Sequence, residues 1–119
     1  MNNKPNPILD KSYAFALRIV KMYKFLSEEK HEYIMSKQAL ASGTEIGAFV
    51  TTAQEADNRV IFHQDMNTAL RKAERTKYWL KLLCESGYLE ENLFLAINAD
   101  CVELIRLLTA ITKTTRNSI

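Results

Sequence analysis

The chain has 119 residues, of which 47% are hydrophobic and 25% are charged. This length fits one domain with a modest core, and a formal net charge of +2 is too small to demand an anionic partner. Both prolines, Pro5 and Pro7, lie in the first seven residues. The rest of the chain can therefore be helical almost without interruption.

No segment has the pattern of a secretion signal or a membrane span. Residues 1–10 hold polar residues and prolines where a signal peptide needs an apolar core. The most apolar run, residues 93–111, is interrupted by Asp100, Glu103 and Arg106. We therefore expect a cytoplasmic protein without a membrane partner.

Residues 10–29 are predicted to form a first helix, with Asp10 as its N-cap because a carboxylate accepts the unpaired amide hydrogens of a first turn. A second helix is predicted over residues 33–56. It carries Gly43 and Gly47 one turn apart, and each glycine costs about 1 kcal/mol relative to alanine in a helix interior. Either a neighbouring backbone or a large side chain approaches the helix there, or the helix kinks or frays.

A third helix is predicted to begin after Asn58, which suits an N-cap, and to end at Gly87, where glycine can adopt the left-handed conformation that closes a helix. Its apolar residues alternate at steps of four and three, which places them on one stripe. They are Phe62, Met66, Ala69, Ala73, Thr76, Leu80 and Leu83. The same spacing predicts a fourth helix over residues 91–114.

Short connections between these helices predict an all-α, antiparallel up-down-up-down four-helix bundle. The bundle domain is expected to span residues 10–114, between disordered tails at residues 1–9 and 115–119. The helices carry more apolar residues than one stripe per helix can use. This surplus favours self-association, with a broader apolar face within a monomer as the alternative.

The sequence predicts no enzyme, because no catalytic motif, cofactor site or metal site is evident. A di-iron centre needs Glu-x-x-His on two helices of a bundle, and the one match, Glu28 to His31, lies at a predicted helix end. Residues 43–47 lack the lysine and the hydroxyl residue of a phosphate-binding loop. Cys84 and Cys101 have no metal-type spacing, and two reduced, buried thiols are favoured over a disulfide.

Basic residues gather on two predicted helices, which makes nucleic-acid binding the better functional hypothesis. They are Arg18 and Lys21 on the first helix and Arg71, Lys72, Arg75, Lys77 and Lys81 on the third. In a monomer such clusters can be no more than a solvated face. In a ring every subunit would repeat them, so contacts to RNA or DNA phosphates would add up and depend steeply on salt. Tyr78 and Trp79 could stack on bases or pack at a subunit contact. The competing class is a scaffold that docks a protein partner.

Two motifs cover the middle of the chain. They read Tyr-Ile-Met-Ser-Lys-Gln-Ala-Leu-Ala-Ser-Gly-Thr-Glu-Ile-Gly-Ala at residues 33–48 and Asn-Thr-Ala-Leu-Arg-Lys-Ala-Glu-Arg-Thr-Lys-Tyr-Trp-Leu at residues 67–80. Together with residues 12–21 and 103–109, they resemble a bacterial four-helix bundle family. That family includes proteins encoded in intervening sequences of large-subunit ribosomal RNA genes. It also includes the accessory variability protein of diversity-generating retroelements.

The resemblance implies an antiparallel bundle assembled as a ring, a homopentamer, without enzymatic activity. The retroelement members bind nucleic acid through a basic ring surface and contact a reverse transcriptase, whereas the function of most other members is unknown. The sequence departs from the family pattern after Gly47. Residues 48–53 read Ala-Phe-Val-Thr-Thr-Ala, where members usually carry an asparagine and then a glutamate. A role for those polar positions is therefore not implied here.

Overall fold

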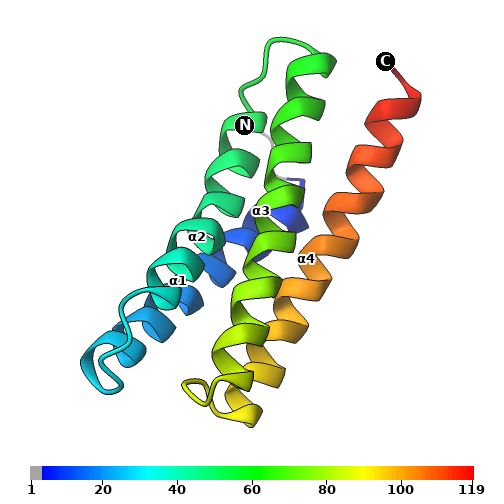
Figure 1. Cartoon of the computed structure of the whole chain (residues 1–119). Helices are drawn as coiled ribbons and strands as arrows, with labels where there is room; N and C mark the ends of the chain where they lie inside the picture. The colour runs from blue at the N-terminus through cyan, green and yellow to red at the C-terminus, as the bar shows by residue number, and fades with distance from the viewer. Residues whose placement is uncertain (1–3) are drawn as a thin grey trace.

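Four helices make up the protein in a computed structural model that describes residues 4–119. They are α1 (Pro7–Glu28), α2 (Met35–Ala53), α3 (Arg59–Glu85) and α4 (Glu91–Asn117). The helices run alternately up and down in a molecule of 45 × 28 × 22 Å (Figure 1). The part of the chain that is described holds no strand. This confirms the predicted all-α antiparallel four-helix bundle.

Each helix packs on its neighbours in the chain, and α1 also contacts α4. In Figure 1, α2, α3 and α4 lie side by side while α1 passes behind them. Within residues 4–119, no Cα atom of α1 lies within 8 Å of a Cα atom of α3, so these two helices are diagonal to one another in the bundle. Two ion pairs bridge α1 and α4, Lys11 Nζ to Glu103 Oε1 at 3.2 Å and Arg18 Nη1 to Asp100 Oδ2 at 2.6 Å. Because α2 and α4 lie between them, α1 and α3 present their outward faces on different sides of the bundle.

The predicted apolar stripes form the core. On α3 the buried residues are Met66, Ala69, Ala73, Thr76, Leu80 and Leu83. They are the predicted ones, apart from Phe62, which is half-buried. The predicted stripes of the first and fourth helices are buried in the same way. Ile19 and Leu26 on α1 and Leu104 and Leu108 on α4 are almost fully buried.

The end of α3 is built as the sequence predicts. Gly87 has φ of +91°, and its N–H donates to the carbonyl of Cys84 at 3.1 Å while the N–H of Tyr88 donates to the carbonyl of Leu83 at 3.0 Å. This is the pair of bonds that closes a helix on a left-handed glycine. At the other end, the Asn58 side chain accepts the N–H of Ile61 at 2.9 Å, which confirms the predicted cap.

The predicted start of α1 is wrong. The helix begins at Pro7 and its N-cap is Asn6, whose side-chain oxygen accepts the N–H of Leu9 at 3.4 Å. Proline suits a first helical position because the N–H that it lacks would have no partner there. Asp10 lies inside the first turn instead, where its negative charge favours the helix dipole.

Two other boundaries also differ from the prediction. Helix α4 continues to Asn117, so residues 115–117 are helical rather than disordered, as are residues 7–9. Of the expected N-terminal tail, residues 1–3 lie outside the described residues. Helix α2 ends at Ala53, three residues before the predicted end.

Helix α2 also starts two residues later than predicted, because Glu32 caps it. Glu32 is only 6% exposed, and its carboxylate accepts the N–H groups of Ile34, Met35 and Ser36 at 3.1, 2.9 and 2.7 Å. His31, with φ of +54°, turns the chain just before it. Burial raises the pKa of Glu32, but the hydrogen bonds from Met35, Ser36 and Ile34 together outweigh it, so the pKa lies below its ordinary value.

Candidate nucleic-acid interface

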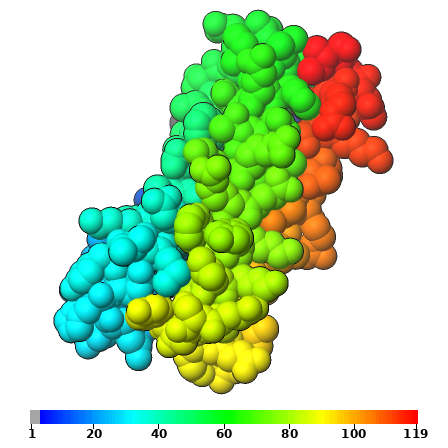
Figure 2. All heavy atoms as spheres, in the orientation of Figure 1, coloured from blue at the N-terminus to red at the C-terminus, as the bar shows by residue number. Residues whose placement is uncertain are grey.

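The outward face of α3 carries two of the predicted basic residues, Arg71 and Arg75. Both are exposed, lie one turn apart and line a hollow with Thr68, Lys72 and Glu74. Figure 2 shows that α3 is open to solvent along one face of the molecule. Within residues 4–119, neither arginine lies within ion-pair distance of a carboxylate. Their guanidinium groups are therefore open to an external anion.

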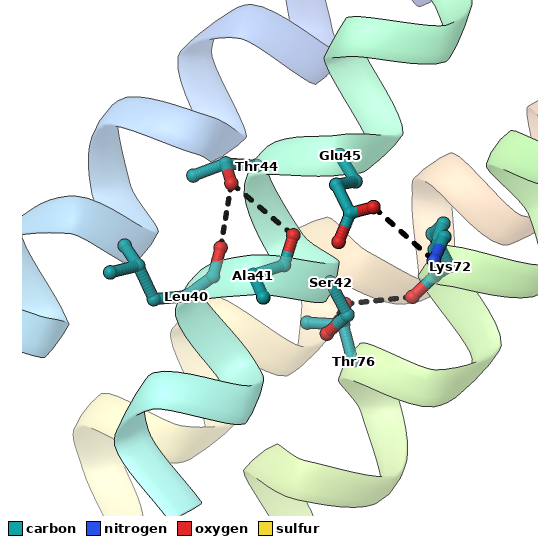
Figure 3. Close-up of polar contacts among 7 residues, drawn as sticks. All are labelled: Leu40, Ala41, Ser42, Thr44, Glu45, Lys72 and Thr76. Atoms are coloured by element: carbon teal, nitrogen blue, oxygen red, sulfur yellow. Dashed lines mark hydrogen bonds and ion pairs between the residues drawn. The ribbon is translucent and has the colours of Figure 1, made fainter. Parts of the chain in front are cut away.

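Lys72 points toward α2 instead. Its Nζ lies 3.3 Å from Oε2 of Glu45 (Figure 3). One turn further along, the Thr76 hydroxyl lies 2.7 Å from Oγ of Ser42 and 2.8 Å from the carbonyl oxygen of Lys72. The contacts of Lys72 with Glu45 and of Thr76 with Ser42 fix the register of α3 against α2. The carboxylate of Glu45 also offsets part of the charge on Lys72.

Lys77 and Lys81 flank the arginines on the side of α3 that faces α4. Lys81 lines a hollow with Cys84 and Phe94. Lys77 is close enough to the Cys101 thiol for its charge to act there. Burial nevertheless raises the pKa of that thiol to about 12. The two lysines thus extend the positive charge of α3 beyond Arg71 and Arg75.

Arg18 and Lys21 lie on α1, away from the basic residues of α3. Arg18 is paired with Asp100 across the contact with α4. Lys21 is exposed and borders an apolar groove between α1 and α4, whose other lining residues include Phe25 and Leu93. Because α1 and α3 are diagonal to one another in the bundle, the seven predicted residues do not form one patch in a single copy of the chain.

The two aromatic residues beside the basic ones differ in exposure. Tyr78 is 59% exposed, whereas Trp79 is half-buried and its Nε1 is buried without a hydrogen-bond partner in the described part of the chain. The rings meet edge to face, with centroids 5.0 Å apart at an interplanar angle of 77°. Only Tyr78 is therefore placed to meet a ligand in solution.

Sequence reasoning missed the acidic partners of the basic residues. Glu45 and Asp100 lie on different helices from Lys72 and Arg18, and such pairs depend on the register between helices. Sequence spacing reveals only pairs three or four residues apart on one helix. No signal in the sequence distinguished the paired Lys72 from the unpaired Arg71.

The structure also bears on the expectations for a metal site, a membrane span and the two cysteines. No group of three His, Cys, Asp or Glu side chains among residues 4–119 could hold a metal ion. In the same residues, no helix combines the length and hydropathy that crossing a membrane requires. Cys84 and Cys101 form no disulfide. Cys101 is buried as predicted, but Cys84 is only half-buried, so that part of the expectation is wrong.

The fold and this basic surface define a small helical-bundle protein. Residues 4–110 match the 23S rRNA-intervening sequence protein family, and the chain belongs to that family. It is similar to a crystal structure from Bacteroides thetaiotaomicron, described as a protein with unknown function from the S23 ribosomal protein family. The two chains are 45% identical, the match covers 89% of this chain and 98% of that one, and the TM-score is 0.88. No curated protein matches the chain. The resemblance to intervening-sequence proteins is thereby confirmed.

Proposed function

We propose that the protein is a non-enzymatic, self-associating bundle that binds nucleic acid through the outward face of α3. The observation that carries this proposal is the exposed pair Arg71 and Arg75, which has no carboxylate partner within residues 4–119. The two residues are separated by about 6 Å along the helix axis. Guanidinium groups at such a spacing suit successive phosphates, to which each can donate two hydrogen bonds.

Self-association would turn this small patch into an extended one. A single copy has a net charge of only +2, whereas a ring presents the same arginines once per subunit, so that phosphate contacts add up. Exposed apolar side chains supply surface for contacts between copies, among them Phe25 on α1 and Leu93 and Leu95 on α4. The resemblance to ring-forming relatives supports a pentamer.

The test is fluorescence anisotropy of a labelled RNA titrated with the protein at several salt concentrations. Four or more phosphate contacts should give a log–log salt slope of about −3 or steeper, at about −0.7 per contact for a single strand. Arg71→Glu/Arg75→Glu should abolish binding and leave the circular dichroism of the bundle unchanged. Light scattering of the wild type should give a mass about five times 13.7 kDa. A monomer mass would contradict the assembly.

A matched variant controls for total charge. Lys37→Glu/Arg106→Glu changes the net charge as much as the arginine variant does, at two exposed positions on other helices. This control should retain binding. If both variants lose affinity equally, overall charge and not the α3 face is responsible. If the wild type does not bind at low salt, nucleic-acid binding is wrong.

A second candidate function is a scaffold that docks a partner protein. The observation that favours it is the apolar groove between α1 and α4, which Met22, Phe25, Leu89, Leu93 and Ile97 line. Exposed apolar surface of this kind is typical of interaction sites. Flat anisotropy at every salt concentration would favour this second candidate over nucleic-acid binding.

A further inference from the structure

A continuous stripe on the outward face of α3 combines charge with apolar surface. Arg71, Arg75, Tyr78 and Leu82 follow each other at steps of four, three and four residues, so they lie above one another on the same side of the helix. All four are exposed. The ring of Tyr78 thus follows the two unpaired cations, Arg71 and Arg75, and lies about 4.5 Å from Arg75 along the helix axis.

The ring of Tyr78 is held in place without being covered. Trp79 contacts it edge to face at 5.0 Å and is itself half-buried against the core. Yet 59% of Tyr78 remains exposed, and its hydroxyl has no hydrogen bond to any residue in the described range 4–119. A large apolar ring that is oriented by a neighbour and left open to water is typical of a stacking platform.

We propose that Tyr78 stacks on a base of single-stranded nucleic acid whose phosphates contact Arg71 and Arg75. The inference rests on the proposed function and specifies its ligand class. In a duplex the faces of the bases are already stacked on each other and cannot reach an aromatic side chain on a protein surface. An unpaired strand can place its phosphates on the arginines and turn a base onto the ring. Leu82 extends the apolar part of the platform by one turn.

The experiment compares one labelled oligonucleotide, as a single strand of RNA, as the same sequence in DNA and as each of the two duplexes. Wild-type protein should prefer both single strands to their duplexes. Tyr78→Ala should weaken single-strand binding by roughly 5- to 150-fold, the range expected for one lost stacking contact. Tyr78→Phe should retain affinity, because the ring and not the hydroxyl makes the contact. A difference between the RNA and DNA strands would identify which of them is bound.

Two readouts separate stacking from a general loss of charge or structure. The salt slope of Tyr78→Ala should equal that of the wild type, since no phosphate contact is removed, whereas Arg75→Glu should flatten it. Trp79 is the single tryptophan and touches Tyr78, so its fluorescence should change when a base binds. Tyr13→Ala removes another exposed ring, 67% exposed on α1, and should bind like the wild type.

If the wild type binds duplex as tightly as single strand, or if Tyr78→Ala retains full affinity, the stacking inference is overturned while the basic face still stands. If Tyr78→Ala changes the mass of the assembly, the ring packs between copies and the inference is again overturned. Absence of any binding by the wild type removes the proposed function and, with it, the inference.

Discussion

Gly43 on α2 faces Ile19 on α1 so closely that a Cβ atom at Gly43 would lie 2.9 Å from Cγ1 and 3.0 Å from Cγ2 of Ile19. Gly47, one turn on, faces the backbone of Ser12 at a slightly longer distance, because the Ser12 carbonyl oxygen would be 3.3 Å from an added Cβ. The sequence left two explanations for these glycines, either close approach by a neighbouring element or a kinked or frayed helix. Close approach is confirmed, because α2 continues as a helix through both glycines and α1 lies against them. The glycines let α1 and α2 pack at short range.

Gly43→Ala should destabilise the protein although alanine is the better helix former. Overpacking against Ile19 costs about 1–3 kcal/mol, which exceeds the gain in propensity of about 1 kcal/mol. In the background of Ile19→Ala, where both Cγ atoms are gone, the same change should become neutral or stabilising. Urea unfolding of the four proteins at one protein concentration measures this coupling.

Ala41→Gly provides the control, because Ala41 is exposed on the same helix. It should cost about 1 kcal/mol through propensity alone. Equal effects of Gly43→Ala in the wild-type and Ile19→Ala backgrounds would show that Ile19 is not what excludes a side chain from position 43.

Glu32→Gln should lower the free energy of unfolding by about 1 kcal/mol at pH 7, because the amide hydrogens of Ile34, Met35 and Ser36 lose a charged acceptor. The folded-state pKa of Glu32 lies below its ordinary value. Its contribution to stability is therefore fully present above the unfolded-state pKa, about 4.3, and is lost as the pH falls through the folded-state pKa. The difference between wild type and variant should accordingly shrink below about pH 4.

Urea unfolding at pH 7 and pH 3 checks this prediction, with Glu29→Gln as control. Glu29 is exposed on the same turn, and its substitution should change stability by less than about 0.5 kcal/mol. A difference between Glu32→Gln and wild type that stays constant from pH 7 to pH 3 would contradict the role of the ionised carboxylate.

The core was predictable from sequence because helical periodicity depends only on local spacing. The stripe from Met66 to Leu83 and the stop at Gly87 follow from residue types at fixed steps. Helix starts were less predictable. Asn6 and Asp10 are both good caps by residue type, and a proline at the first position, Pro7, was the signal that favoured Asn6. Glu32, in a charged segment, gave no sign that its carboxylate folds back onto α2.

The candidate site was predictable only in part, for a related reason. Spacing placed Arg71 and Arg75 on a common face, and the structure leaves both exposed. Whether a cation is neutralised depends on the helix beside it, so the partners of Lys72 and Arg18 required the packed bundle. The exposure of Tyr78 is also a tertiary property, since the register of the helix against the core decides that Trp79, and not Tyr78, turns inward.

The two cysteines should differ in reactivity toward a thiol reagent at pH 8. Cys101 is buried, its Sγ lies 3.3 Å from the carbonyl oxygen of Ala73, and burial raises its pKa to about 12. Only roughly one Cys101 in ten thousand would be thiolate at that pH. We expect one thiol per chain to react quickly, the half-buried Cys84, and the second only after denaturation. Cys84→Ser should remove the fast reaction. A fast reaction of two thiols in the folded protein would contradict the burial of Cys101.

Glu45→Gln should strengthen nucleic-acid binding if the α3 face is the interface. Its carboxylate lies 3.3 Å from Nζ of Lys72, so the substitution frees one more cation beside Arg71 and Arg75. The anisotropy titration should show a higher affinity and a salt slope steeper by about 0.7, the contribution of one added phosphate contact. Folding should hardly change, because exposed ion pairs contribute about 0–1 kcal/mol.

Glu103→Gln is the matched control for this last prediction. It raises the net charge by the same amount and frees Lys11, whose Nζ lies 3.2 Å from Glu103, but it does so at the contact of α1 with α4. Because α1 and α3 are diagonal to one another in the bundle, the freed Lys11 lies away from the α3 face and should leave the salt slope unchanged. Equal gains from the two variants would mean that net charge alone attracts the ligand. A gain from Glu103→Gln only would move the interface from α3 to α1, where Arg18 and Lys21 lie.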